Sequence, residues 1–84
     1  MSDLALLPLY ECHKQVRAAK IKMLVSDAHG PYIITDTGLR IRVEANYIAK
    51  HMPTPGGYFV LYGDGYQSFS PAAAFEQGYS RVEP

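Results

Sequence analysis

The chain has 84 residues, of which 48% are hydrophobic and 19% charged, and its formal net charge at pH 7 is zero. This composition is typical of a folded globular domain, and it excludes a disordered or collagen-like chain. A neutral chain also lacks the overall positive charge with which most nucleic-acid-binding domains neutralise phosphates.

The N-terminal segment is apolar from Leu4 to Leu9. It follows Asp3 instead of a basic region, and it is too short for a signal-peptide core or a transmembrane span. We therefore expect no membrane association and one domain over residues 1–84, with residues 1–9 as a docking strand or a packed tail. The single cysteine, Cys12, cannot form an intramolecular disulfide, which favours a reducing cytoplasm.

Three segments in the first half of the chain have strand patterns. Residues 14–26 alternate apolar with polar side chains, which predicts a half-buried strand. Residues 32–35 and 39–43 flank Asp36-Thr37-Gly38 and predict a hairpin. A two-residue loop would place Ile34 opposite Ile41 and Tyr32 opposite Val43, which separates an apolar face from a polar one. A three-residue loop would place Ile34 opposite Arg40 and mix the faces, so we prefer the two-residue loop.

A short helix is predicted next, over residues 44–52, with Tyr47, Ile48 and Met52 on one side and an end before Pro53. Pro53 to Gly57 then form a stiff, bent entry to the following strand.

Residues 56–79 contain all three Phe and four of the seven Tyr. We expect a hairpin of residues 58–62 and 66–69 around Asp64-Gly65, in a register that places Val60 opposite Phe69. Both faces of this hairpin are apolar or aromatic. It should therefore either lie between two layers or leave one face for a partner.

A second helix is predicted from Ser70 or Pro71 to Gln77, with Ser70 as its cap and Gly78 as a left-handed end. Phe75 and Tyr79 should hold it to the sheet. The fold class expected is α+β: an antiparallel sheet of about four or five strands, made of two hairpins and an N-terminal strand, with one or two short helices.

Enzyme chemistry is not expected from this sequence. Cys12 and His13 are neighbours, so on a strand their side chains point to opposite faces and cannot readily pair. Neither the cysteine nor the histidines have the spacing of a zinc site, and no two carboxylates form an evident acid–base pair. We predict no catalytic, cofactor-binding or metal-binding residues.

The C-terminal third resembles a signature of small phage- and prophage-encoded proteins of uncharacterised function. The matching pattern is Pro-Gly-Gly-Tyr, an apolar strand, a glycine turn, Ser-Phe-Ser-Pro, then Phe-Glu and a following Tyr, within residues 55–82. The resemblance implies a phage accessory protein in the bacterial cytoplasm and brings no catalytic residues. Turn glycines, a capped helix and anchoring aromatics explain much of the same pattern structurally.

Protein binding is the function that we favour, because Tyr is abundant where partners bury a surface. The partner would be a host or phage protein, and an exposed sheet edge could equally serve homo-oligomer formation. The alternative is a nucleic-acid-binding module, in which Tyr58, Tyr62 and Phe69 would be stacking platforms. They would lie beside a basic face made of Lys14, Arg17, Lys20, Lys22, Arg40 and Arg42. Against both stands the simpler interpretation of a solvated basic face and core aromatics. The candidate contact residues are Tyr58, Tyr62, Tyr66 and Phe69, with Arg40 and Arg42 at the rim.

Overall fold

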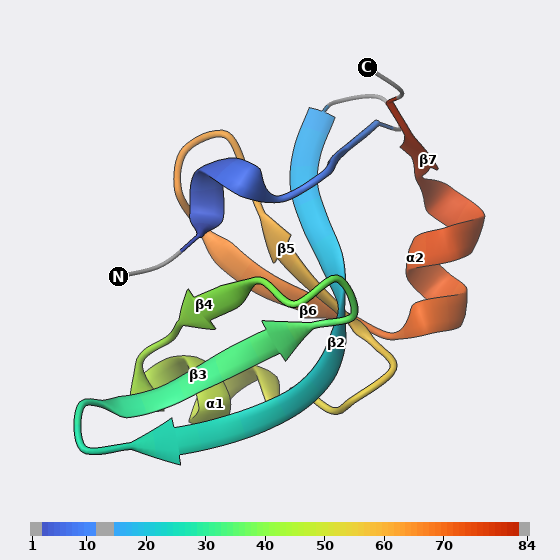
Figure 1. Cartoon of the computed structure of the whole chain (residues 1–84). Helices are drawn as coiled ribbons and strands as arrows, with labels where there is room; N and C mark the ends of the chain where they lie inside the picture. Colours follow the sequence, from blue (N-terminus) through green and yellow to red (C-terminus); the bar gives the residue numbers. More distant parts are fainter. Residues whose placement is uncertain (1–2, 12–14, 83–84) are drawn as a thin grey trace.

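A computed structural model describes residues 3–11 and 15–82 and has the predicted α+β architecture, an antiparallel sheet with two short helices (Figure 1). The five expected strands are present, and the short strands β1 and β7 extend the sheet. The elements are η1 (Leu4–Leu6), β1 (Leu9–Glu11), β2 (Gln15–Asp27), β3 (Gly30–Thr35), β4 (Arg40–Arg42), α1 (Ala45–His51), β5 (Tyr58–Leu61), β6 (Gln67–Ser70), α2 (Ala72–Gly78) and β7 (Ser80–Arg81).

The long strand β2 organises the sheet. The first half pairs with β1 on one side and with β5 on the other, and the second half pairs with β3. The register shifts between Ile21 and Met23, as at a β-bulge, which divides the strand into these two halves. The strand order is β4-β3-β2-β1-β7; off this path, β5 pairs with β2, and β6 pairs with β5.

The first hairpin has a three-residue loop, so the predicted two-residue loop is wrong. The Thr35 N–H donates to the Leu39 carbonyl at 2.9 Å, and Gly38 at the third loop position has a φ of +92°. The Thr35 side chain is fully buried, and its hydroxyl accepts the Leu39 N–H at 3.0 Å. A buried hydroxyl thus completes the hydrogen bonding of the turn, which a pattern of polar and apolar letters does not reveal.

This register also changes which side chains enter the core. Ile33 lies opposite Ile41 and both are fully buried, whereas Ile34 lies opposite Arg40 and Tyr32 opposite Arg42. The pairings predicted for Ile34 and Tyr32 were therefore wrong. Instead, the side chains of Ile34 and Tyr32 lie on the face of the sheet away from Ile33 and Ile41, together with two arginines.

Thr35→Val tests the role of this hydroxyl. The substitution keeps the volume but leaves the Leu39 N–H without its acceptor, so we expect the free energy of unfolding to fall by about 1–3 kcal/mol. Urea denaturation measures the change. Thr35→Ser retains the hydroxyl and is the control. Equal stability of Thr35→Val and wild type would contradict the role assigned to Thr35.

The second hairpin also has a three-residue loop. The Tyr62 N–H donates to the Tyr66 carbonyl at 2.9 Å, and Gly65 at the third loop position has a φ of +93°. Phe59 therefore lies opposite Phe69, and the predicted pairing of Val60 with Phe69 is wrong. The expectation that this two-sided apolar hairpin lies between layers agrees with the structure, because each face packs on a separate cluster.

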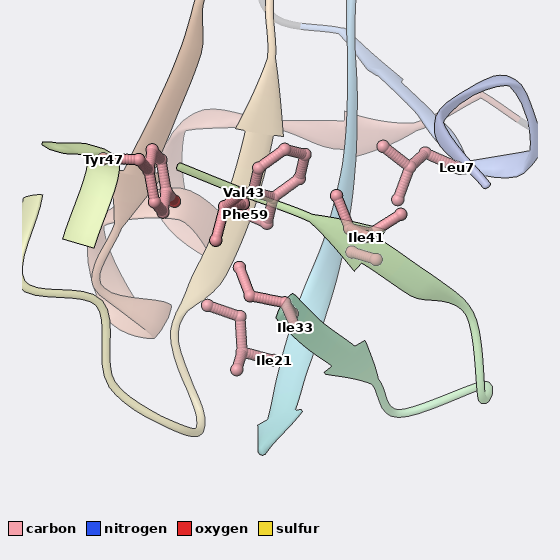
Figure 2. Packing of buried hydrophobic residues seen from close by; sticks show 8 residues of the cluster. Leu7, Ile21, Ile33, Ile41, Val43, Tyr47 and Phe59 are labelled. Carbon is pink, nitrogen blue, oxygen red and sulfur yellow. The ribbon is translucent and has the colours of Figure 1, made fainter. Parts of the chain in front are cut away.

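The two clusters form the core. Core cluster 1 lies on the side of the sheet covered by α1 and η1 (Figure 2), and core cluster 2 lies under α2. Cluster 1 consists of Leu7, Ala19, Ile21, Ile33, Ile41, Val43, Tyr47 and Phe59, and cluster 2 of Val16, Ala18, Tyr58, Val60 and Phe75.

Both predicted helices are present, but their ends differ from the prediction. In α1 the Tyr47 side chain is buried and its hydroxyl donates to the Ser68 carbonyl at 2.7 Å. Met52 has a left-handed φ of 46° and is 75% exposed, so it does not share the packed side of the helix.

The C-terminal helix is anchored as predicted but not capped as predicted. Phe75 is buried in core cluster 2, and Tyr79 packs against it. Ser70 makes no capping bond; its hydroxyl donates to the Pro71 carbonyl instead. Gly78 lies inside α2, and the cap residue, Tyr79, is extended. The predicted roles of Ser70 and Gly78 are therefore wrong.

The N-terminal segment packs on the sheet. Leu7 is buried in core cluster 1. Asp3 bonds the outer edge of β4: its N–H donates to the Arg40 carbonyl at 3.0 Å, and its carboxylate accepts the Arg40 N–H at 3.1 Å. This pairing satisfies the backbone of Arg40 at the sheet edge.

Candidate partner-binding surface

One face of the β2–β3–β4 sheet carries a mixture of apolar, aromatic and cationic side chains. Residues that lie opposite one another on neighbouring strands direct their side chains to the same face. The register therefore forms two rows across the three strands. We call the set the outer face: Met23, Ile34 and Arg40 in one row, and Val25, Tyr32 and Arg42 in the other.

The outer face is not part of the core. None of its side chains belongs to, or packs against, either core cluster among the described residues. In Figure 1, α1 lies behind β3, and no helix lies in front of it. Met23 is 44% exposed, and Val25, Tyr32 and Ile34 are partly exposed, so the sheet presents adjoining apolar side chains to solvent.

The two arginines are arranged around Tyr32. Their guanidinium carbons lie 5.8 Å (Arg40) and 5.0 Å (Arg42) from the centre of its ring, within the range of cation–π attraction. Arg42 also donates to both carboxylate oxygens of Asp27, at 2.9 and 3.0 Å, and to the Gly30 carbonyl at 2.7 Å. Arg42 is thus held in one position, while the exposed Arg40 side chain makes no ion pair within the described part of the chain.

The ion pair at this face should have a measurable acid titration. The hydrogen bond from Arg42 lowers the pKa of the Asp27 carboxyl from its ordinary 3.8 to about 2. Because the folded pKa is the lower one, the pair stabilises the fold above pH 3.8, and this contribution is lost as the pH falls through about 2. A carboxyl-carbon NMR titration should show this midpoint, and Arg42→Gln should return it toward 3.8. A wild-type midpoint near 3.8 would contradict the pairing.

The aromatic residues predicted as contacts do not form one surface. Tyr58 is only 7% exposed; its ring stacks on Phe75 at 4.2 Å and its hydroxyl donates to Glu76 at 2.8 Å. Burial is the largest cause of a raised pKa for Tyr58. Phe69 packs against core cluster 1, on the opposite face of the hairpin from Tyr58. Tyr58 and Phe69 therefore serve mainly as packing residues.

Tyr62 and Tyr66 lie together beside the second hairpin loop. Their ring centres are 6.0 Å apart, but Tyr62 is partly buried against core cluster 2, whereas Tyr66 is 44% exposed. The Tyr66 hydroxyl lies 3.3 Å from His51 Nε2, and Lys50 Nζ lies 5.2 Å from the centre of the Tyr66 ring. Tyr66, His51 and Lys50 line a shallow groove of about 520 Å³ between α1 and the loop, and Arg42 also borders it. Arg40 and Arg42, the other predicted contacts, lie on the outer face.

Sequence reasoning missed the apolar half of the outer face. It placed Tyr32 and Ile34 opposite core residues, because a two-residue loop gave the hairpin one apolar face and one polar face. The available signal was the glycine at the third position of both loops, Asp36-Thr37-Gly38 and Gly63-Asp64-Gly65, which suits a three-residue hairpin loop.

Neither a metal site nor a membrane-spanning helix is present in the described ranges. Residues 3–11 and 15–82 contain no group of three His, Cys, Asp or Glu side chains that could hold a metal ion. Within the same ranges no helix is long and apolar enough to cross a bilayer. Cys12 and His13, the pair considered for nucleophilic chemistry, lie outside the described residues.

No protein-family model, no curated protein and no solved structure matches this chain. Its function is therefore inferred from its own surface.

Proposed function

We propose that this chain is a non-enzymatic accessory protein of a phage or prophage, which binds a host or phage protein in the bacterial cytoplasm through its outer face. The observation that carries protein binding is the exposure of Met23, Val25, Tyr32 and Ile34 beside two arginines. The phage origin and the compartment rest on the resemblance of residues 55–82 and on the single cysteine.

The composition of the outer face favours a protein partner. Tyr, Met and Arg are enriched in the buried centres of protein interfaces. Because Arg42 is already held by Asp27 and the Tyr32 ring, it would lose little side-chain freedom on binding. The neighbouring apolar side chains supply surface whose burial stabilises a complex.

The nucleic-acid alternative receives less support from the geometry. Two of its three stacking platforms are unsuitable, because Tyr58 is buried and Phe69 packs on the other side of its hairpin. The positive charge of Arg42 is already paired with Asp27. A single-strand binder needs accessible rings along a cationic track.

Affinity capture from bacterial lysate tests the proposal. The tagged protein is compared with Arg40→Glu and with Arg81→Glu, which reverses an exposed arginine on β7. Capture is run with and without nuclease. We expect one nuclease-resistant partner, with similar recovery by wild type and Arg81→Glu and at least about tenfold weaker binding by Arg40→Glu, as at an interface hot spot. Nuclease-sensitive capture, or equal capture by Arg40→Glu, would contradict binding of a protein at the outer face.

A further inference from the structure

We propose that the partner contributes an extended, acidic segment that adds as a strand to the free edge of β2, beside the outer face. This inference rests on the proposed function, since it specifies which kind of segment the protein binds. It follows from the hydrogen bonding of the sheet and from the charges and apolar side chains along that edge.

Within the described residues, the backbone of β2 has hydrogen-bonding groups after the bulge that no other strand uses. In an antiparallel ladder, successive residues bond alternately to the strand on one side and to the strand on the other. Thr35 bonds to Leu39 and Pro31 to Val43, so these positions of β3 face β4. Ile34 and Tyr32 alternate with the residues that bond to β4, so their backbone N–H and C=O groups point to β2.

The same alternation applies to β2. Met23 and Val25 lie opposite Ile34 and Tyr32 and bond to β3, so the N–H and C=O groups of Leu24 and Ser26 point to the other edge. The partner of Ser26 confirms this orientation. It is Pro31, which has no N–H and whose carbonyl accepts the Val43 N–H.

No other strand of the described chain covers this part of the edge. β5 pairs with β2 only from Arg17 to Lys20, and Gly56 and Gly57 then bond to Ile21. Figure 1 shows β3 along one side of the second half of β2 and no strand along the other. The edge of β4, by contrast, is bonded by Asp3. An exposed strand edge of this kind is a template for strand addition.

The side chains at this edge specify the chemistry of the segment. Met23 and Leu24 are exposed apolar residues that point to opposite faces of the sheet, so an added strand would contact apolar surface on both faces. Lys22, at one end, makes no ion pair among the described residues, whereas Asp27, at the other end, is neutralised by Arg42. The edge therefore suits a segment with consecutive apolar residues, one for each face, and a carboxylate near Lys22. A second copy pairing antiparallel along this edge would bring the end that carries Asp27 toward Lys22, but that carboxylate is already bonded to Arg42.

The probe for the test is a library of random decapeptides displayed on phage and selected on the intact protein. A selected peptide is then synthesised, and its affinity is measured for wild type, Ser26→Pro and Ser26→Ala. Proline removes the outward N–H, while alanine retains it and serves as the matched control. We expect selected peptides with neighbouring apolar residues and at least one acid. Their affinity should be unchanged by Ser26→Ala and at least tenfold weaker for Ser26→Pro.

Hydrogen exchange of the wild-type protein provides a measurement that does not depend on the folding of a variant. Bound peptide should slow exchange of the Leu24 and Ser26 amides. Failure to select any peptide, undiminished binding to Ser26→Pro, or protection elsewhere would each overturn strand addition. Sedimentation measures whether the wild-type protein dimerises. Dimers that Ser26→Pro abolishes would show self-association through β2 and would overturn the choice of a partner's segment over a second copy of the chain.

The two proposals fail separately. A captured protein that loses affinity for Arg40→Glu but binds Ser26→Pro normally would support the outer face and overturn strand addition. A captured protein whose binding is indifferent to Arg40→Glu would overturn the proposed function itself.

Discussion

Phe59→Ala is expected to lower the free energy of unfolding by about 3–5 kcal/mol, which is the usual cost of removing a fully buried aromatic ring. Phe59 has no exposed surface and lies in core cluster 1, where its ring is 5.8 Å from that of Tyr47 (Figure 2). A small domain has a total stability of roughly 5–15 kcal/mol, so the variant should be largely unfolded in moderate urea.

Urea denaturation followed by circular dichroism measures this effect, with Tyr66→Ala as the control. Tyr66 is aromatic but 44% exposed, and its replacement should cost less than about 1 kcal/mol. Equal losses for the two variants would contradict the assignment of Phe59 to the core and of Tyr66 to the surface.

Phe75→Ala is the second substitution with a large expected effect, about 3 kcal/mol or more, and it tests core cluster 2. The Phe75 ring stacks on Tyr58 at 4.2 Å and on Tyr79 at 4.6 Å, and it meets the edge of Tyr10 at 4.8 Å. It is the buried residue of α2, so without it the helix should no longer hold to the sheet.

Hydrogen exchange separates this effect from global unfolding. In Phe75→Ala, amides of α2 should exchange much faster, while those that join β3 to β4, which pack on core cluster 1, should change less. Gln77→Ala, an exposed substitution on the same helix, is the control. Uniform acceleration across both regions would contradict the separation of the two clusters.

The element order of this fold was predictable from local patterns. Alternation over residues 14–26 identified β2, and Pro71 before Ala72-Ala73-Ala74 marked the start of α2. These signals depend on neighbouring residues only, so no knowledge of tertiary packing was needed. The fold class followed from the order of hairpins and helices.

Strand register was not predictable in the same way. Each hairpin differs by one residue from its predicted loop length, and a shift of one residue exchanges the two faces of a strand. The deciding contact at the first loop is the buried Thr35 hydroxyl on the Leu39 N–H, which depends on three-dimensional packing. The error concealed the outer face, because it assigned Tyr32 and Ile34 to the core.

The candidate site was predictable only in its cationic part. Arg40 and Arg42 were predicted as rim contacts of the aromatic residues, and the structure places both on the outer face. The aromatic part was misplaced, since the abundance of Tyr and Phe in residues 56–79 does not distinguish rings that fill a core from rings that face solvent. Tyr58 and Phe69 mainly fill the core, and the aromatic ring of the outer face is Tyr32, beside Arg42.

Site-specific photo-crosslinking tests binding through the outer face most directly. A photoreactive phenylalanine derivative is placed at Tyr32 on the outer face or at Gln77 on α2, and each protein is irradiated in bacterial cells. We predict one crosslinked protein from position 32, absent when Arg40→Glu is added, and no such product from position 77. The same crosslinked protein from both positions, or from position 77 alone, would contradict binding through the outer face.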